Sequence, residues 1–301
     1  MKVVLAGDLD AAEWVAWRAA LAQAMPEAQW LAPDEARQHA AEVHAAVVAN
    51  PPPGSLAGLP ALRLIQSLWA GVDRLLADAT LPAGVPVARM VDPAMSAAMA
   101  ETALWATLAL HRGFFTYQQQ QGDGLWRQHP QRRADEVNVL VLGRGAMGSA
   151  VAQRLAAQGY AVRTWGRDNP AGLPPLVAAA EIVINLLPLT PATRGLLGAR
   201  FFAGMRAGAA LLNFGRGAHV VDGDLLAALD SGRLRHAVLD VFHAEPLPPQ
   251  HRFWSHPRVT VLPHAAALTD PRSAAAVAAA NLRALGDGQP LAHLVDSQRG
   301  Y

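Results

Sequence analysis

Three glycines in the middle of the chain have the spacing of a phosphate-binding loop. Gly143, Gly145 and Gly148 follow an apolar run over 137–142 and precede a helical pattern over 149–158. In such a strand–turn–helix unit, the first glycine permits the turn, the second leaves room for a pyrophosphate, and the third lets the helix pack on the strand. Free N–H groups at the start of the helix favour an anion. The spacing therefore predicts a dinucleotide site.

Alternating strands and helices must position this loop. Apolar runs that end at turn residues alternate with helical patterns, which is typical of parallel α/β sheets. We expect strands at 2–6, 44–49, 62–67, 85–90, 137–142, 160–165, 181–187, 209–213, 237–240 and 259–262, and helices at 11–24, 94–121, 149–158, 222–231 and 270–285.

This order of elements predicts two Rossmann-like domains, one flavodoxin-like and one that binds NAD(P), with parallel sheets and a cleft between them. The substrate domain would be discontinuous, 1–95 plus 270–301, and the nucleotide domain would cover 96–269. The helix over 94–121 is long enough to bridge the two.

Composition favours a cytoplasmic protein with well-packed cores. The 301 residues are 52% hydrophobic and 16% charged, which excludes a disordered chain. A net charge of +1 gives no field that would attract nucleic acid or a membrane surface, and no apolar run could span a bilayer. The lack of cysteine excludes disulfides, thiolate metal sites and cysteine nucleophiles. We expect no metal site.

Several motifs downstream of the glycine loop resemble those of the D-isomer-specific 2-hydroxyacid dehydrogenases. In the family's order, they are Asn185-Leu-Leu-Pro-Leu-Thr-Pro-Ala-Thr-Arg-Gly, Asn213-Phe-Gly-Arg-Gly, Leu239-Asp-Val-Phe, Ala244-Glu-Pro and Pro263-His264. The match covers most of the chain from about 60 to 272, and the chain is most similar to the glyoxylate/hydroxypyruvate reductase branch. The resemblance implies a homodimer that reduces a small 2-keto acid, glyoxylate or hydroxypyruvate, with a nicotinamide cofactor.

The resemblance assigns catalysis to Arg216, Glu245 and His264, each expected in a loop after a strand. Hydride transfer to a keto carbon leaves an oxygen that needs a proton, and His264 suits this role because the ordinary pKa of histidine is near 6.5. Glu245 would hold the imidazolium, and Arg216 would bind the substrate carboxylate and polarise the keto oxygen. The other histidines are interpreted as structural, although His251 and His256 are candidates for lining the cleft.

The resemblance also implies that the loop 68–73 contacts the substrate. Backbone N–H groups at Trp69, Ala70 and Gly71 would hold the substrate carboxylate. Many relatives have glycine where Trp69 stands, so its indole would wall the pocket and favour small substrates. The alternative is that Trp69 packs away from the site.

The choice of cofactor depends on the end of the strand after the glycine loop. NAD enzymes place an acidic residue about 20 positions after that loop, where it binds the ribose 2′-OH. Here Trp165 or Gly166 takes that position, and Arg167 follows where it would pair with a 2′-phosphate. We therefore predict NADPH, with NADH as the alternative, because a one-residue shift would make Asp168 the ribose ligand.

Further cofactor contacts are implied by the resemblance. They share a place at a strand end or in the loop that follows: Arg144, Ala146 and Met147 near the pyrophosphate, Leu187 and Pro188 over the adenosine, Thr193 at a phosphate, Phe214 and Gly215 beside the nicotinamide ribose, and Asp240 at the carboxamide. Leu187 and Pro188 are alternatively ordinary strand-end residues.

Three other functions stay open at this point. They are a related dehydrogenase for another 2-keto acid, an NAD(P)-sensing regulator on the same scaffold, and a flavin or S-adenosylmethionine enzyme on a Rossmann-like fold. The set of Arg216, Glu245 and His264 argues against a regulator, because a sensor needs no proton donor. The downstream motifs argue against the flavin or S-adenosylmethionine enzyme.

Overall fold

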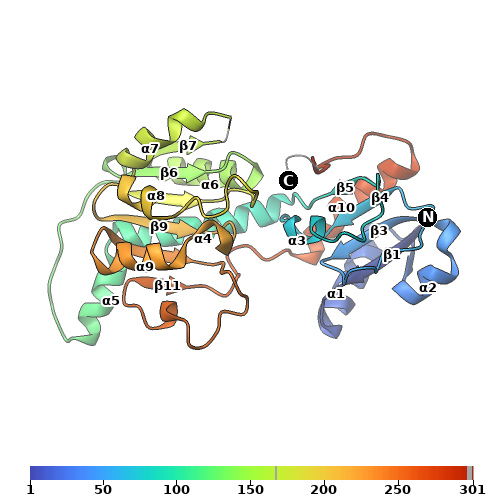
Figure 1. Cartoon of the computed structure of the whole chain (residues 1–301), viewed down its shortest axis with the longest axis horizontal. Helices are drawn as coiled ribbons and strands as arrows, with labels where there is room; N and C mark the ends of the chain where they lie inside the picture. The colour runs from blue at the N-terminus through green and yellow to red at the C-terminus, as the bar shows by residue number, and fades with distance from the viewer. Residues whose placement is uncertain (167, 297–299, 301) are drawn as a thin grey trace. The chain divides into compact units, whose positions relative to one another are not determined.

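A computed structural model describes residues 1–166, 168–296 and 300 and contains two compact α/β units (Figure 1). Unit 1 comprises Met1–Ala94 and the chain from Thr269 onward, and unit 2 comprises Met95–Leu268. The expected class, α/β with parallel sheets, is confirmed. Among the described residues, no helix is both long enough and apolar enough to cross a membrane.

Unit 1 is built on a five-stranded parallel sheet with the order β2-β1-β3-β4-β5. Its strands are β1 (Lys2–Gly7), β2 (Gln29–Leu31), β3 (Val43–Ala49), β4 (Leu64–Ser67) and β5 (Val87–Ala88). Helices α1 (Ala11–Ala24) and α10 (Pro271–Gly286) pack together on one face, and α2 (Pro33–Gln38) and α3 (Asp73–Leu76) add to the core on the other. Burial of both faces explains why β1 and β3 are almost wholly apolar.

Unit 2 is built on a six-stranded parallel sheet with the order β11-β10-β9-β8-β6-β7. Its strands are β6 (Asn138–Leu142), β7 (Ala161–Trp165), β8 (Ile182–Asn185), β9 (Ala209–Asn213), β10 (Leu234–Leu239) and β11 (Val259–Val261). The strand order reverses between β6 and β8. Ligands of open α/β sheets bind beyond the carboxyl ends of the strands at such a switch point.

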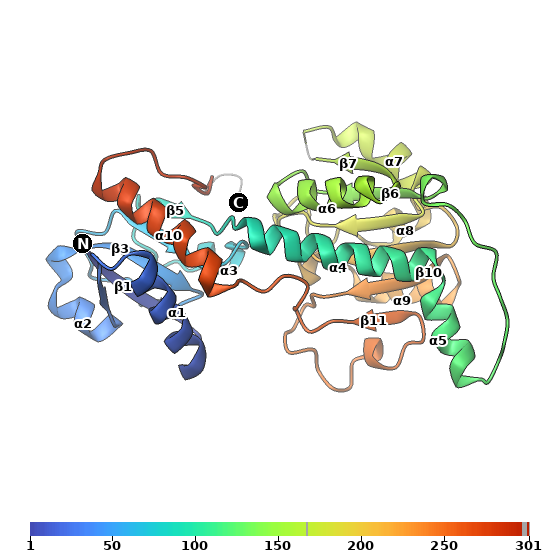
Figure 2. The ribbon, with the colours of Figure 1, turned by 180° about the vertical axis from the view of Figure 1, so that it is seen from behind.

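Helices cover both faces of the second sheet (Figures 1 and 2). On one face, α4 (Pro93–His111) and α6 (Ala146–Ala157) pack on alternate side chains such as Val139 and Val141. On the other face, α7 (Leu173–Ala179), α8 (Ala199–Gly204) and α9 (Asp222–Asp230) pack on Leu140 and Leu142. The two cores hold β6, and therefore the loop that leaves it, in a fixed position.

The prediction of a single long helix over 94–121 is wrong. The segment forms two helices, α4 and α5 (Phe114–Gly122), because Gly113 has a left-handed φ of 75°, a conformation that ends helices. Helix α6 begins at Ala146, three residues before the expected start, so part of the glycine loop is its first turn. The short elements β2, α2, α3, α7 and α8 were not expected.

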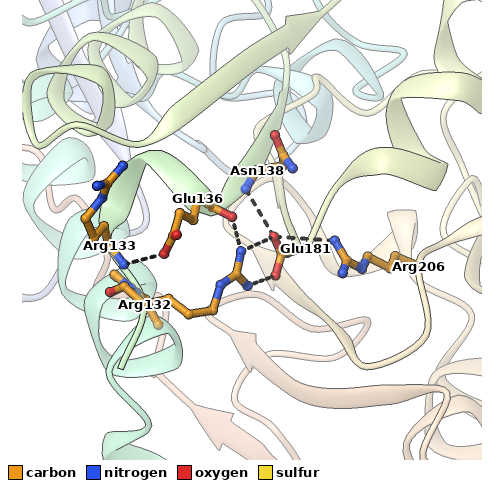
Figure 3. A network of polar contacts seen from close by, with 7 residues as sticks. Arg132, Arg133, Glu136, Asn138, Glu181 and Arg206 are labelled. Carbon is orange, nitrogen blue, oxygen red and sulfur yellow. Dashed lines mark hydrogen bonds and ion pairs between the residues drawn. The ribbon is translucent and has the colours of Figure 1, made fainter. Parts of the chain in front are cut away.

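Glu181 lies just before β8 and forms ion pairs with two arginines. Arg132 and Arg206 approach its carboxylate from different sides (Figure 3). Arg132 Nη2 lies 3.1 Å from Glu181 Oε1, and Arg206 Nη1 lies 3.6 Å from the same oxygen. Arg132 also donates to the carbonyl of Glu136. Burial would raise the pKa of Glu181, but the hydrogen bonds and charge of Arg132 hold it below its ordinary value. This ion pair joins the segment before β6 to the sheet.

Replacing Glu181 with glutamine should lower the free energy of unfolding by about 1–2 kcal/mol at neutral pH, because a partly buried charge-assisted hydrogen bond is lost. The folded pKa is depressed, so this contribution is complete above the unfolded value of about 4.3 and is lost as the pH falls through the folded pKa. Urea unfolding at neutral and acid pH measures it. Glu101→Gln, at an exposed position of α4, is the control. If Glu181→Gln lowered the free energy of unfolding by the same amount at acid pH, the ion-pair explanation would be contradicted.

Candidate active site

The glycine loop leaves β6 and turns directly into α6. Gly143 has a φ of 115°, and its N–H donates to the Trp165 carbonyl at 2.9 Å. A methyl group on Gly143 would lie 2.7 Å from the Leu186 carbonyl oxygen, and one on Gly148 would overlap the Gly143 carbonyl. At Gly145, by contrast, an added methyl group would meet no atom within 4 Å. The first and third glycines are therefore needed for packing, and the second leaves space at the helix N-terminus that fits a pyrophosphate.

The end of β7 carries an ion pair between Arg144 of the glycine loop and Asp168. The guanidinium lies across Gly166, where an added methyl group would be 2.6 Å from Arg144 Nε. The hydrogen bond from Arg144 lowers the pKa of Asp168. Trp165 is buried, and its indole N–H donates to the Asn169 carbonyl at 2.7 Å. Arg167, the predicted partner of a 2′-phosphate, lies outside the described residues.

A histidine–carboxylate pair lies beyond β10 and β11. His264 Nδ1 is 2.7 Å from Glu245 Oε2, and Glu245 Oε1 accepts the Phe242 N–H at 2.8 Å. His264 has a left-handed φ of 54°, a conformation that costs energy for a residue with a side chain, and its N–H is held by the Asp240 carbonyl at 2.9 Å. Because Nδ1 bonds to the carboxylate, Nε2 is the atom that can present a proton.

The charges around this pair favour its ionised form. The hydrogen bond to Glu245 raises the pKa of His264, although burial and the nearby Arg216 charge act in the opposite direction. For Glu245, burial would raise the pKa, but the hydrogen bonds from His264 and Phe242 bring it below its ordinary value. Both shifts favour the imidazolium form of His264 and the carboxylate form of Glu245, the combination that a general acid of this kind would need.

Replacing Glu245 with glutamine should reduce turnover at neutral pH by roughly 10- to 100-fold, through loss of proton-donor charge and orientation. Without the carboxylate, burial and Arg216 lower the pKa of His264, so the alkaline limb of kcat/KM for reduction should move to lower pH. Asp230→Asn is a matched control, since Asp230 Oδ1 pairs with His256 Nε2 at 3.0 Å elsewhere in unit 2. An unchanged pH profile in Glu245→Gln would contradict this role.

Arg216 follows β9 in a loop that packs against the loop carrying Glu245. Its Nη1 donates to the Gly215 carbonyl at 2.8 Å. A methyl group on Gly217 would overlap the Phe242 backbone, so only glycine fits at that position. The Arg216 charge lowers the pKa of both Glu245 and His264, which shows that the three ionisable groups are electrostatic neighbours. The structure thus brings the three predicted residues together beyond β9, β10 and β11.

Several predicted cofactor residues also have structural roles. Asp240 Oδ1 accepts the N–H groups of Ala265 and Ala266 at 2.7 and 3.1 Å, which fixes the loop after His264, and burial raises the Asp240 pKa. The Thr193 hydroxyl donates to the Pro188 carbonyl at 2.8 Å. Leu187 and Phe214 are buried in the two cores of unit 2, as the alternative of strand-end packing expects for Leu187. Their cofactor contacts stay predictions.

Other candidates lie in loops with partners of their own. In unit 1, the Trp69 ring makes an edge contact with the buried Trp17 ring at a centroid distance of 6.5 Å, and the Trp69 N–H donates to Ser67 Oγ at 3.0 Å. Ala70 and Gly71 are partly exposed. In unit 2, His256 lies between Asp230 and the Arg258 N–H, and His251 Nδ1 accepts the Phe253 N–H at 3.3 Å. These contacts favour structural roles for the two histidines.

Sequence reasoning assigned no role to three buried polar residues beside Arg216. Asn185 and Asn213 end β8 and β9, and His219 follows Arg216 by three residues. All three are 0% exposed and hydrogen-bond to one another through Asn185. The sequence signal for this buried hydrogen-bond network was the asparagine at the end of each of two apolar strands, because a buried amide requires hydrogen-bond partners.

The site combines a glycine loop suited to a dinucleotide with a histidine–carboxylate pair beside an arginine, all on one sheet, and this combination defines an NAD(P)-dependent oxidoreductase. Residues 104–266 match the sequence model of the D-isomer specific 2-hydroxyacid dehydrogenase, NAD binding domain. The chain is 42% identical over 301 residues to glyoxylate/hydroxypyruvate reductase A of Serratia proteamaculans (strain 568), covering 95% of this chain and 96% of that protein. The chain therefore belongs to the D-isomer-specific 2-hydroxyacid dehydrogenase family, and the resemblance seen in the motifs is confirmed.

Two solved structures are similar over nearly the whole chain. A D-isomer specific 2-hydroxyacid dehydrogenase from Xanthobacter autotrophicus Py2, in complex with NADPH and MES, is 39% identical with a TM-score of 0.93, covering 99% of this chain and 100% of that one. An NADPH-dependent glyoxylate/hydroxypyruvate reductase from Sinorhizobium meliloti, in complex with NADP and sulfate, is 32% identical with a TM-score of 0.91, covering 100% and 99%.

Proposed function

We propose that this protein reduces glyoxylate and hydroxypyruvate to glycolate and D-glycerate with NADPH. The observation that carries the proposal is the 2.7 Å contact between His264 and Glu245, with Arg216 as a charged neighbour. A relative named glyoxylate/hydroxypyruvate reductase A that matches 95% of the chain supports the substrate class. A related D-2-hydroxyacid dehydrogenase acting on another 2-keto acid is the alternative.

The described residues account for the parts of this reaction that a protein must supply. The bound nicotinamide provides the hydride. His264 gives its proton from Nε2 to the keto oxygen, and Glu245 keeps the ring oriented and charged. The planar guanidinium of Arg216 binds the carboxylate of the keto acid and stabilises negative charge on its oxygen. The space beside Gly145 and the first turn of α6 would hold the pyrophosphate of the cofactor.

The preference for NADPH is supported by the ion pair at the end of β7. Arg144 binds the Asp168 carboxylate, which opposes the alternative in which Asp168 holds a ribose 2′-OH. Two similar solved structures contain NADPH or NADP. Assays of a panel of 2-keto acids with both cofactors test the proposal. We expect the highest kcat/KM for glyoxylate or hydroxypyruvate with NADPH, and Arg167→Ala should weaken NADPH far more than NADH. A higher kcat/KM with NADH would overturn the cofactor assignment.

The substrate contacts of Trp69, Ala70 and Gly71 are also proposals. Replacing Trp69 with alanine removes an indole that is only partly buried against Trp17, so longer 2-keto acids should be accepted with improved kcat/KM. Trp17→Phe is a control, because it alters the same ring contact without shortening residue 69. An unchanged chain-length profile in Trp69→Ala would count against a pocket-lining indole.

We further propose a homodimer that forms through α4, α5 and the segment that follows. Trp105, Phe114 and Trp126 are 45%, 56% and 96% exposed in these elements, and large aromatic side chains of this kind are enriched at protein interfaces. Sedimentation analysis of wild type and Trp126→Ser tests the assembly.

The location of the protein in the cytoplasm stays a prediction from its composition.

A further inference from the structure

We infer that His219 is a positioning residue that fixes the backbone of Arg216 and links it to the loop after β8. The inference rests on the proposed function, because it concerns the arginine that binds the keto acid. His219 is wholly buried and lies three residues after Arg216, in the turn that follows β9.

The two ring nitrogens of His219 have different partners. Nδ1 lies 3.1 Å from the Arg216 backbone N and 2.9 Å from Asn185 Nδ2, and both of those groups can only donate. Nδ1 must therefore accept, which places the ring hydrogen on Nε2. Nε2 lies 3.3 Å from the Pro188 carbonyl oxygen and donates its hydrogen to that oxygen. These partners select one neutral tautomer of the imidazole.

Asn213 holds the other backbone group of the same arginine. Its Nδ2 donates to the Arg216 carbonyl at 3.0 Å, while its Oδ1 accepts from Asn185 Nδ2 at 2.8 Å. Both the N–H and the C=O of Arg216 are thus held by buried side chains. Side chains that do not themselves touch the substrate fix the direction in which the guanidinium leaves the backbone.

The packing leaves the side chains of His219, Asn185 and Asn213 little room to move. A methyl group on Gly215 would lie 3.1 Å from His219 Nδ1 and 2.9 Å from Asn185 Nδ2. The loop after β8 is held by the same residues, because Leu187 N–H donates to Asn185 Oδ1 at 3.3 Å and Pro188 accepts from His219. The loop predicted to cover the cofactor and the loop carrying Arg216 therefore share one buried hydrogen-bond network.

Two substitutions separate the functions of the two ring nitrogens. In His219→Asn, the side-chain oxygen takes the place of Nδ1 and can accept the Arg216 N–H, but the Pro188 contact is lost. In His219→Gln, an N–H can reach Pro188, but the acceptor for Arg216 is lost. We expect His219→Gln to lower kcat/KM for the keto acid by roughly 10- to 100-fold through both KM and kcat, with little change in the Kd of NADPH. His219→Asn should keep kcat within a few-fold and weaken NADPH binding.

The readouts distinguish positioning from simple loss of stability. His236→Gln is the matched control, because His236 is also buried in unit 2 but bonds to Thr260 and stacks on Phe115. Thermal unfolding is measured for all variants. The alkaline limb of the pH profile should move little in either His219 variant, because the hydrogen bond to Glu245, the largest influence on the His264 pKa, is unchanged. The inference would be overturned if His219→Asn and His219→Gln lost equal amounts of kcat/KM for the keto acid. It would also be overturned if His219→Gln kept a kcat/KM near that of wild type.

Nitrogen-15 NMR of the imidazole gives an answer that does not depend on turnover. We expect the His219 ring to show the Nε2–H tautomer at neutral pH in wild type. The Nδ1–H tautomer or a charged ring would overturn the inference even if the enzyme is active. Wild type that fails to reduce every 2-keto acid of the panel would instead overturn the proposed function and leave the tautomer result to decide the role of His219.

Discussion

Replacing His264 with glutamine should lower kcat for glyoxylate reduction by roughly 10²- to 10⁴-fold, the usual contribution of a positioned general acid. The variant loses the proton on Nε2, whereas the glycine loop that is expected to bind the cofactor is unchanged. NADPH binding, measured by fluorescence, should therefore stay near the wild-type value. His129→Gln, in the segment after α5, is the control for loss of a histidine with hydrogen-bond partners.

The wild-type pH profile is the second half of this prediction. The proposed mechanism requires the acid form of His264, and the hydrogen bond to Glu245 raises the His264 pKa above its ordinary value of 6.5. The kcat/KM for reduction should therefore fall to half its maximal value only at a pH above 6.5, as the pH rises through the raised pKa. Oxidation of the 2-hydroxy acid needs the neutral ring and should show the opposite trend. A His264→Gln variant that keeps most of its turnover would show that another group supplies the proton.

Replacing Arg216 with lysine should lower kcat/KM for the keto acid by roughly 10²- to 10³-fold, which corresponds to about 3–4 kcal/mol of transition-state stabilisation. Lysine keeps the charge but cannot form the two parallel hydrogen bonds of a guanidinium with a carboxylate. Both a higher KM and a lower kcat are expected, because the arginine is proposed to bind the carboxylate and also to stabilise the developing oxyanion. Steady-state kinetics with glyoxylate measures both constants.

The control for Arg216→Lys is Arg258→Lys. Arg258 Nη1 also donates to a backbone carbonyl, that of Leu229 at 2.7 Å, but in another part of unit 2. We expect this variant to keep wild-type kinetics. If Arg216→Lys raised the KM for NADPH and left the KM for the keto acid unchanged, the assignment of Arg216 to the substrate would be wrong.

Much of the fold was predictable because the strands of both sheets are short apolar runs with clear ends. The glycine spacing located the turn between β6 and α6, and the motifs located the loops after β9, β10 and β11. The break between α4 and α5 was not predicted, because Gly113 alone does not reveal whether a helix tolerates it or ends there. Elements such as β2 and α3, with three and four residues, are too short to show a period.

The candidate site was predictable to the extent that its residues belong to motifs. Arg216, Glu245 and His264 were expected as a group, and the structure places them as electrostatic neighbours. The role of His219 was not predictable, because its partners Asn185 and Pro188 are 34 and 31 positions away and meet it only when β8 and β9 pair. A single histidine in a sequence does not disclose which of its nitrogens will be held, or by what.

The lack of space at Gly217 limits how the substrate range of this protein can be re-engineered. The loop after β9 meets the Phe242 backbone there without room for one methyl group, and the Phe242 N–H holds Glu245. A library that varies residues 215–217 to accommodate new acids would therefore disturb the Glu245–His264 pair, the proposed proton donor, at the same time. Residues 69–71, the proposed substrate contacts in unit 1, take no part in that contact and are the better positions to vary.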